Sequence, residues 1–153
     1  MTDDGGAIRD PERRFRLAKS FFANVPHNTA LGMQIVAIGD DEAVFELPYG
    51  NHLIGNPDTG VIHGGAITAL LDGASGAAVF AAMTKMVPIA TLDLRIDYLR
   101  PATVGRTIVC RATCYKTTRN IAFTRAVAYH DDAGDPIAHS VGTFMTSTRG
   151  GPK

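Results

Sequence analysis

Hydrophobic and polar positions change their spacing along the chain, and this spacing predicts where helices and strands form. From His63 to Met83 the apolar residues recur at intervals of three and four, which is typical of a helix with a wide apolar face. After this stretch, apolar and polar residues alternate from Thr91 to Tyr98, which predicts a strand with one face on a core. The alternation places Thr91 on the polar face, together with Asp93.

The same patterns and the turn residues between them predict the remaining elements. Residues 10–25 predict an amphipathic helix with Asp10 as its cap and Pro11 in its first turn, and its arginines, Arg14 among them, are expected to face solvent. Pro26 begins the segment that breaks this helix. Strands are expected at residues 33–39, 42–47, 91–98, 106–117, 120–130 and 136–147, and a loop at residues 48–62.

A run of strands beside one long apolar helix predicts an α+β fold. We expect a curved antiparallel sheet of about six strands wrapped around the central helix, with the N-terminal helix as an addition. The 153 residues are enough for a single domain with its own core. This domain is expected at residues 10–148, between a disordered N-terminal tail at residues 1–9 and a C-terminal tail at residues 149–153.

Composition and charge narrow the classes of function. The chain has 15 acidic and 15 basic residues, which argues against a protein that binds nucleic acid by neutralising phosphates. The first residues lack the basic start and apolar block of a secretory signal. Because the apolar helix contains Asp72 and is rich in alanine and glycine, we expect it in a protein core and not in a membrane.

The two cysteines, Cys110 and Cys114, are interpreted as buried thiols. On a strand they point to the same face about 13 Å apart, too far for a disulfide bond between them. Buried free thiols are typical of a reducing compartment, so a cytoplasmic location is expected.

The start of the central helix is a candidate binding site. Gly64 and Gly65 open the helix, where backbone N–H groups have no intrahelical acceptor, and without a Cβ atom they allow a ligand to come close. Such a helix end attracts an anion, or a carbonyl oxygen that gains negative charge in a transition state. The alternative is that the glycines only permit a tight turn, and that His63 hydrogen-bonds its own loop.

Asp72 is the second candidate, because a carboxylate inside an apolar helix needs a partner or a function. It lies eight residues after Gly64, about 12 Å along the helix, whereas both groups must lie roughly 3 Å from one reacting centre. The two can cooperate only if two helices lie antiparallel about a two-fold axis. The alternative is a carboxylate that a nearby N–H group satisfies. Ser75 is expected to be a packing residue or a hydrogen-bond partner of Asp72.

Other common sites have no support in the sequence. It contains no His-Glu-x-x-His, Cys-x-x-Cys or Gly-x-x-x-x-Gly-Lys pattern, so neither a metal site nor nucleotide hydrolysis is indicated. The Gly-x-Ser-x-Gly pattern of a serine nucleophile is also missing.

One ordered set of motifs carries a family resemblance. It consists of His63-Gly64-Gly65 with Asp72 nine positions after the histidine, then Thr91-Leu92-Asp93-Leu94, then Tyr98-Leu99-Arg100-Pro101-Ala102. On these motifs the chain resembles the hotdog-fold acyl-CoA thioesterases, specifically the phenylacetate-pathway (PaaI-type) branch. The resemblance runs from about residue 31 to residue 146.

The resemblance implies a tetramer built from dimers that hydrolyses an acyl-CoA thioester to a free acid and coenzyme A, without a metal or redox cofactor. It implies that the Gly64 N–H polarises the thioester carbonyl, while Asp72 of the partner chain acts as general base or nucleophile. It further implies that His63 holds the loop or the thioester and that Thr91 orients the attacking water. Asn56 matches an asparagine that assists near the carbonyl, although its loop is about one residue longer than the common one.

Five residues are candidates to contact the substrate or the coenzyme, and the resemblance implies three of them. They are Gly65, Ser75, Arg100, Arg119 and Asn120, of which the last three are candidates to contact the phosphates and could equally be solvated surface groups. Two other functions stay open: an acyl-thioester hydratase or dehydratase of the same fold, and a non-catalytic module that binds acyl-CoA for regulation. Aryl and medium-chain acyl groups are both compatible with the sequence.

Overall fold

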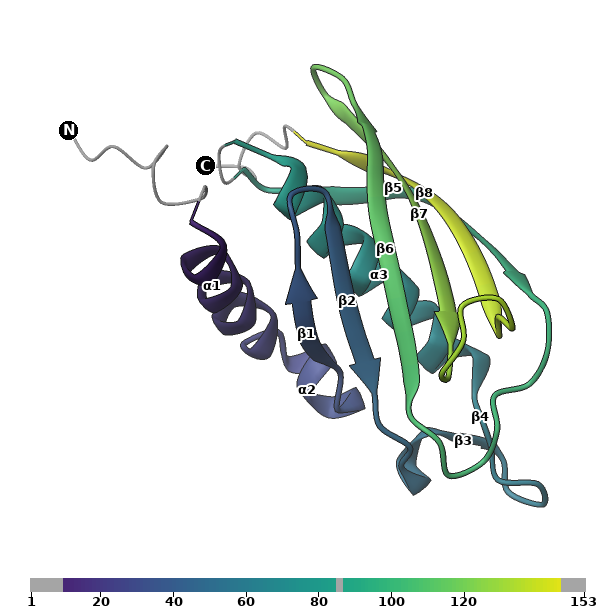
Figure 1. Ribbon diagram of the computed structural model, residues 1–153. Coiled ribbons are helices and arrows are strands. Elements are labelled where there is room, and N and C mark those ends of the chain that lie inside the picture. Colours follow the sequence, from purple (N-terminus) through teal and green to yellow (C-terminus); the bar gives the residue numbers. More distant parts are fainter. Residues whose placement is uncertain (1–9, 85–86, 147–153) are drawn as a thin grey trace, which may run out of the picture.

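A six-stranded antiparallel sheet wraps around one long helix, α3 (Gly64–Ala82), in the computed structural model, which describes residues 10–84 and 87–146 (Figure 1). Two shorter helices, α1 (Pro11–Ala23) and α2 (Pro26–Leu31), lie beside the first strand. This arrangement confirms the α+β fold and the N-terminal helix expected from the sequence. The two predicted tails, at residues 1–9 and 149–153, lie outside the described residues.

The strands follow the order β1-β2-β6-β7-β8-β5, so β1 and β5 form the two edges of the sheet. Their bounds are β1 (Gln34–Ile38), β2 (Glu42–Leu47), β5 (Ala90–Tyr98), β6 (Ile108–Thr117), β7 (Ile121–Tyr129) and β8 (Ala138–Met145). These six strands are the ones that the alternation of polar and apolar residues predicted.

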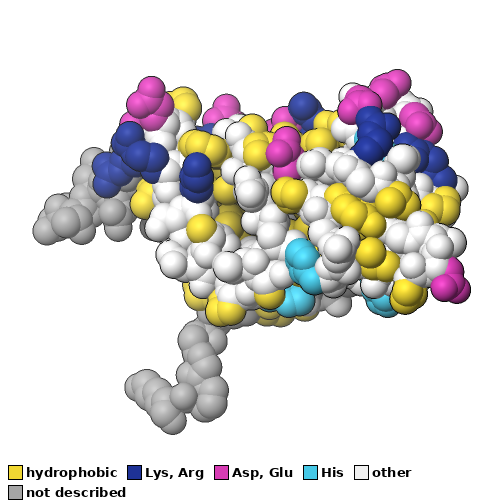
Figure 2. Space-filling model, turned by 90° about the horizontal axis from the view of Figure 1, so that it is seen from below, with side chains coloured by type: hydrophobic (Ala, Val, Ile, Leu, Met, Phe, Trp, Pro, Cys, Tyr) yellow, Lys and Arg dark blue, Asp and Glu magenta, His cyan; other side chains and the backbone are white. Residues whose placement is uncertain are grey.

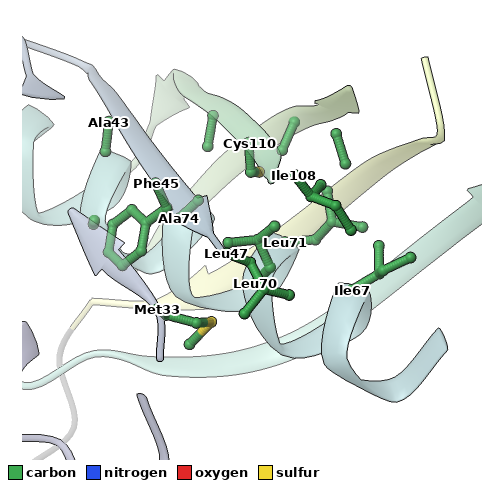
Figure 3. Close-up of a cluster of buried hydrophobic side chains, with 14 of the residues drawn as sticks. Met33, Ala43, Phe45, Leu47, Ile67, Leu70, Leu71, Ala74, Ile108 and Cys110 are labelled. Carbon is green, nitrogen blue, oxygen red and sulfur yellow. The ribbon is translucent and has the colours of Figure 1, made fainter. Parts of the chain in front are cut away.

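The core lies between α3 and the inner face of the sheet (Figure 3). Leu70, Leu71 and Ala74 of α3 are fully buried, and Phe45 and Cys110 reach them from the strands. By length and composition α3 could cross a membrane, but 61% of its 18-residue apolar window is buried inside this chain. The helix is therefore the core element that its sequence predicted.

Two predicted loops contain regular structure. The segment after α1 continues as the short helix α2, because Pro26 has a ring that suits a first helical position and Gly32 ends the helix with a φ of 76°. The loop at residues 48–62 holds a 3-10 turn, η1 (Asn51–Leu53), and a small hairpin of β3 (Ile54–Asn56) and β4 (Val61–Ile62). Sequence reasoning missed these elements because each is only a few residues long.

Helix α1 is fastened to the sheet by a residue that was expected to face solvent. The Arg14 side chain is 9% exposed, and its Nη1 donates to the Gly39 carbonyl and to Asp40 Oδ1, each at 2.7 Å. Ala18, one turn further on, is fully buried. The prediction that Arg14 is solvated was wrong, because its partner is a turn that only the tertiary fold brings close.

Candidate active site

His63 is the cap of α3 and is held in place from two sides. Its Nδ1 accepts a hydrogen bond from the Gly65 N–H at 2.8 Å, and its own N–H donates to the Leu53 carbonyl at 2.8 Å. Gly55 of β3 lies so close that a Cβ atom there would be 2.7 Å from the Cα atom of His63. The small β3–β4 hairpin therefore sets the position from which α3 begins.

The two glycines at the start of α3 differ in what the fold requires of them. A Cβ atom on Gly65 would lie 2.8 Å from His63 Nδ1, so the imidazole would have to shift if this position carried a side chain. A Cβ atom on Gly64 would meet nothing nearer than the Tyr98 hydroxyl, at an ordinary 3.5 Å. Neither glycine has a positive φ, so a turn that only glycine can form does not explain the pair.

The backbone N–H groups in the first turn of α3 differ in whether they have an acceptor. The Gly65 N–H is bound by His63, and the Ala66 N–H donates to the His63 carbonyl at 3.0 Å. Within residues 10–84 and 87–146, no acceptor faces the Gly64 N–H. Of the two glycines singled out in the sequence, only Gly64 keeps a donor for a ligand at the positive end of the helix.

Asp72 is partly exposed on the face of α3 that the sheet leaves largely uncovered, and among the described residues it has one hydrogen-bond partner, on the edge strand β5. The Thr91 hydroxyl donates to Asp72 Oδ1 at 2.9 Å. A β-bulge between Thr91 and Asp93 makes this contact, because it pairs Thr91 with the buried Phe144 of β8 and turns its side chain to α3. The expectation that Thr91 lies on the polar face with Asp93 was wrong, and the bulge is the reason.

Within one subunit the two ends of the candidate site stay apart. Gly64 and Asp72 belong to the same unbroken helix, so about 12 Å separates them along its axis. Strand β5, which carries Thr91, is an edge strand with much of its length exposed, including Leu92 at 51% and Tyr98 at 50%. The uncovered face of α3 and the open edge of β5 together leave room for a second polypeptide.

Asn56 and Ser75 have local roles in the subunit. The side-chain oxygen of Asn56 accepts from the Asp58 N–H at 3.0 Å, so it stabilises its own turn. Ser75 is fully buried, and among the described residues its Oγ has no hydrogen-bond partner. The structure therefore shows Ser75 as a packing residue and does not bring it into a hydrogen bond with Asp72.

The three candidates for coenzyme phosphates lie in different surroundings. Arg100 is bound by Asp135, with Nε at 3.1 Å from Oδ1 and Nη2 at 2.9 Å from Oδ2, so its guanidinium is already paired. Arg119 and Asn120 are exposed at the turn between β6 and β7. Figure 1 shows this turn at the end of the molecule opposite the β3–β4 hairpin, and so far from the start of α3 in the same subunit.

Two residues near the start of α3, Thr68 on the helix and Tyr98 at the end of β5, received no role from the sequence. The Tyr98 hydroxyl lies 2.8 Å from the Gly64 carbonyl oxygen and 2.6 Å from Thr68 Oγ1. Tyr98 belonged to the motif that carried the family resemblance, and its place at the end of β5 is the signal that could have identified it.

The lower face of the molecule, as Figure 1 is oriented, carries hydrophobic, charged and histidine side chains. Seen from below, histidine side chains lie between patches of hydrophobic side chains, and basic side chains gather toward the sides (Figure 2). In the part of the chain that the structure describes, no three His, Cys, Asp or Glu side chains are grouped so that they could hold a metal ion.

Comparison with known proteins gives one family. The model of the thioesterase superfamily matches residues 59–137, which include the start of α3, Asp72 and β5. The chain is 28% identical to the medium/long-chain acyl-CoA thioesterase YigI of Escherichia coli, over 91% of this chain and 97% of that protein.

Solved structures agree with this match. A protein of Pseudomonas aeruginosa is 42% identical with a TM-score of 0.77, over 85% of this chain and 96% of that one. A variant of the phenylacetic acid degradation protein PaaI of Thermus thermophilus is 27% identical with a TM-score of 0.70, over 80% of this chain and 99% of that one. These matches confirm the family resemblance and the hotdog fold.

Proposed function

Because this chain belongs to the thioesterase superfamily, we propose that it hydrolyses acyl-CoA thioesters to a free acid and coenzyme A in sites shared by two subunits. The acyl-CoA substrate is taken from the similarity to YigI and from the motifs around His63. The dimer is the smallest assembly that completes the site, since Gly64 and Asp72 cannot meet within one chain.

In the proposed mechanism, the thioester carbonyl oxygen accepts a hydrogen bond from the Gly64 N–H at the positive end of α3. A water molecule attacks the carbonyl carbon while Asp72 of the partner subunit takes its proton. The oxyanion that forms is stabilised by the Gly64 N–H. It then collapses, the carbon–sulfur bond breaks, and the sulfur leaves as the thiolate of coenzyme A, which takes up a proton.

Thr91 has a defined part in this scheme. Its hydroxyl donates to one carboxylate oxygen of Asp72, Oδ1, and so leaves Oδ2 to accept the proton of the water. The acid is thereby oriented by a neighbouring strand of its own subunit. This arrangement supports Asp72 as a general base that acts through water.

The observation that carries the proposal is the state of Gly64. The fold has room for a side chain at this position, and yet the chain has glycine there and an unused N–H at a helix start. A close approach by a ligand oxygen explains both features. The open edge of β5 explains how the partner's Asp72 comes near.

The test uses variants that remove one half of the site each. Asp72→Ala removes the base, and Gly64→Pro removes the N–H at a first helical position, where proline fits and where the ψ of 133° at His63 suits a following proline. Thiol release is measured over alkyl and aryl acyl-CoAs. Each variant is expected to lose about 10²–10³-fold in turnover.

Co-expression of the two variants decides whether the site is shared. In a mixed dimer, the Asp72→Ala chain supplies an intact Gly64 to the intact Asp72 of the other chain, so random mixing restores about a quarter of the wild-type sites. Hybrids that stay inactive, or a fully active monomer, would show that the site is not shared. Tight binding of acyl-CoA without thiol release would instead favour a regulatory module.

A further inference from the structure

Three oxygen atoms form a triangle at the start of α3. The Tyr98 hydroxyl lies 2.8 Å from the Gly64 carbonyl oxygen and 2.6 Å from Thr68 Oγ1, and Thr68 Oγ1 lies 3.1 Å from the Gly64 carbonyl oxygen. Tyr98 ends strand β5, whereas Gly64 and Thr68 belong to the first turns of α3. The triangle therefore joins the edge strand to the end of the helix where the substrate carbonyl is proposed to bind.

Only two protons serve these three contacts. Each hydroxyl has one proton to donate, and the carbonyl oxygen has none. Either Tyr98 donates to Gly64 and Thr68 donates to Tyr98, or Thr68 donates to Gly64 and Tyr98 donates to Thr68. In both arrangements the Gly64 carbonyl accepts a hydroxyl proton, and the proton of Tyr98 keeps β5 attached to the helix.

The peptide that accepts this proton also orients His63. The Gly64 carbonyl and the Gly65 N–H belong to one peptide unit, and that N–H donates to His63 Nδ1 at 2.8 Å. Hydrogen bonds in series polarise one another, so donation to the carbonyl strengthens the N–H as a donor. Since Nδ1 accepts, the neutral ring carries its proton on Nε2, and the exposed imidazole presents an N–H donor beside Gly64.

We propose that Tyr98 is a positioning residue for the thioester site, acting with Thr68 through the Gly64–Gly65 peptide to fix the Gly64 N–H and the His63 ring. This inference rests on the proposed function. Tyr98 does not itself touch the reacting atoms in this scheme. Its hydroxyl holds the helix start that carries the Gly64 N–H, the donor that binds the carbonyl oxygen as it gains charge, and the His63 ring beside it.

The variants separate the hydroxyl from the ring and from the fold. Tyr98→Phe removes only the hydroxyl, and Thr68→Val removes the second hydroxyl while keeping the shape. Thr68→Ser keeps the hydroxyl and is the conservative rescue. Tyr115→Phe is the matched control, because Tyr115 and Tyr98 are each 50% exposed and Tyr115 lies on β6, where it contacts Arg125.

The kinetic expectation is a fall in kcat at nearly constant KM. Loss of one positioning hydrogen bond should lower the kcat of Tyr98→Phe about five- to tenfold, with less than about a twofold change in KM. Thr68→Val should lose less, because the Tyr98 hydroxyl that remains lies 2.8 Å from the Gly64 carbonyl oxygen, whereas the Thr68 hydroxyl that remains in Tyr98→Phe lies 3.1 Å away. Thr68→Ser and Tyr115→Phe should keep wild-type kcat.

Nuclear magnetic resonance supplies a readout that does not depend on turnover. In Tyr98→Phe the amide proton of Gly65 should move upfield as its bond to His63 weakens, and the ring nitrogens of His63 should shift with it. Tyr115→Phe should leave these resonances unchanged. A smaller kcat together with the Gly65 shift supports the proposal.

Other results would overturn it, and they separate it from the proposed function. If Tyr98→Phe keeps its kcat while Asp72→Ala is inactive, the thioesterase proposal stands and the role of Tyr98 is wrong. If kcat falls without any shift at Gly65, the route through the peptide is wrong. If wild type releases no thiol from the acyl-CoA panel, the proposed function fails and the role of Tyr98 fails with it.

Discussion

The two edges of the sheet have different surroundings, although both belong to the same small subunit. At β1, helix α1 lies alongside the strand, and Arg14 ties that helix to the β1–β2 turn. At β5, no strand of the described chain pairs with the outer edge, and large apolar side chains are exposed on the strand, at Leu92, and directly after it, at Leu99. An unpaired edge with apolar side chains is a template for another chain.

This difference teaches which part of the molecule serves the fold and which part serves the proposed chemistry. The closed edge contains none of the proposed catalytic groups. The open edge carries Thr91 and Tyr98, which bind Asp72 and the Gly64 carbonyl. In the proposed scheme, a subunit that leaves this edge open holds half of a site at each end of the uncovered face of α3.

The largest effect is expected from charges on the open edge. Leu92→Lys combined with Leu99→Lys should dissociate the proposed dimer and lower thiol release at least about a hundredfold, because in the proposed scheme each subunit alone lacks one half of the site. Sedimentation and thiol release measure the two effects together. The matched control is Val36→Lys on β1, a position that is 40% exposed, which should change neither quantity. A monomeric double variant with full turnover would show that the open edge is not needed for activity.

An intermediate effect is expected at the closed edge, and it concerns stability alone. Arg14→Ala removes a nearly buried donor from the Gly39 carbonyl and should lower the free energy of unfolding by about 1–3 kcal/mol, with unchanged kcat. Asp40→Asn is the control, because the Asp40 side chain is 95% exposed and such a pair contributes about 0–1 kcal/mol. Urea unfolding measures both. A loss of turnover in folded Arg14→Ala would contradict the division between the edges.

The sequence predicted the parts of this picture that depend on local pattern. The helix from Gly64 to Ala82 and the separation of Gly64 from Asp72 both follow from helical spacing, and the structure has them. The family match confirms the resemblance that the motifs carried. The six strands follow from alternation of polar and apolar residues.

What the sequence could not predict depends on partners that are distant in the chain. The bulge that turns Thr91 toward Asp72 is a property of how β5 pairs with β8, and no local alternation shows it. The burial of Arg14 depends on a turn at Asp40, and the bond from Tyr98 to Gly64 spans 34 residues. Tertiary pairing decides each of these contacts.

The smallest expected effect concerns the reactivity of the two thiols on β6, which lie outside the proposed site. Their labelling rate measures how much each edge of the sheet stabilises the core. Burial raises the pKa of the Cys110 thiol and, as the main cause, that of Cys114, so little thiolate is present at pH 8. Native protein should therefore react slowly with a thiol reagent, and both cysteines should react in denaturant.

Labelling requires an opening of the structure. The labelling rates of variants at the two edges therefore show how much each edge stabilises the core. Arg14→Ala weakens the side of the sheet where β2 pairs Phe45 with Cys110, so labelling should become several-fold faster. The double substitution at Leu92 and Leu99 should leave the rate near that of wild type, since both side chains are exposed and lie outside the core cluster. Equal acceleration in both variants would mean that the open edge also stabilises the core, and that assembly and folding are one process in this protein.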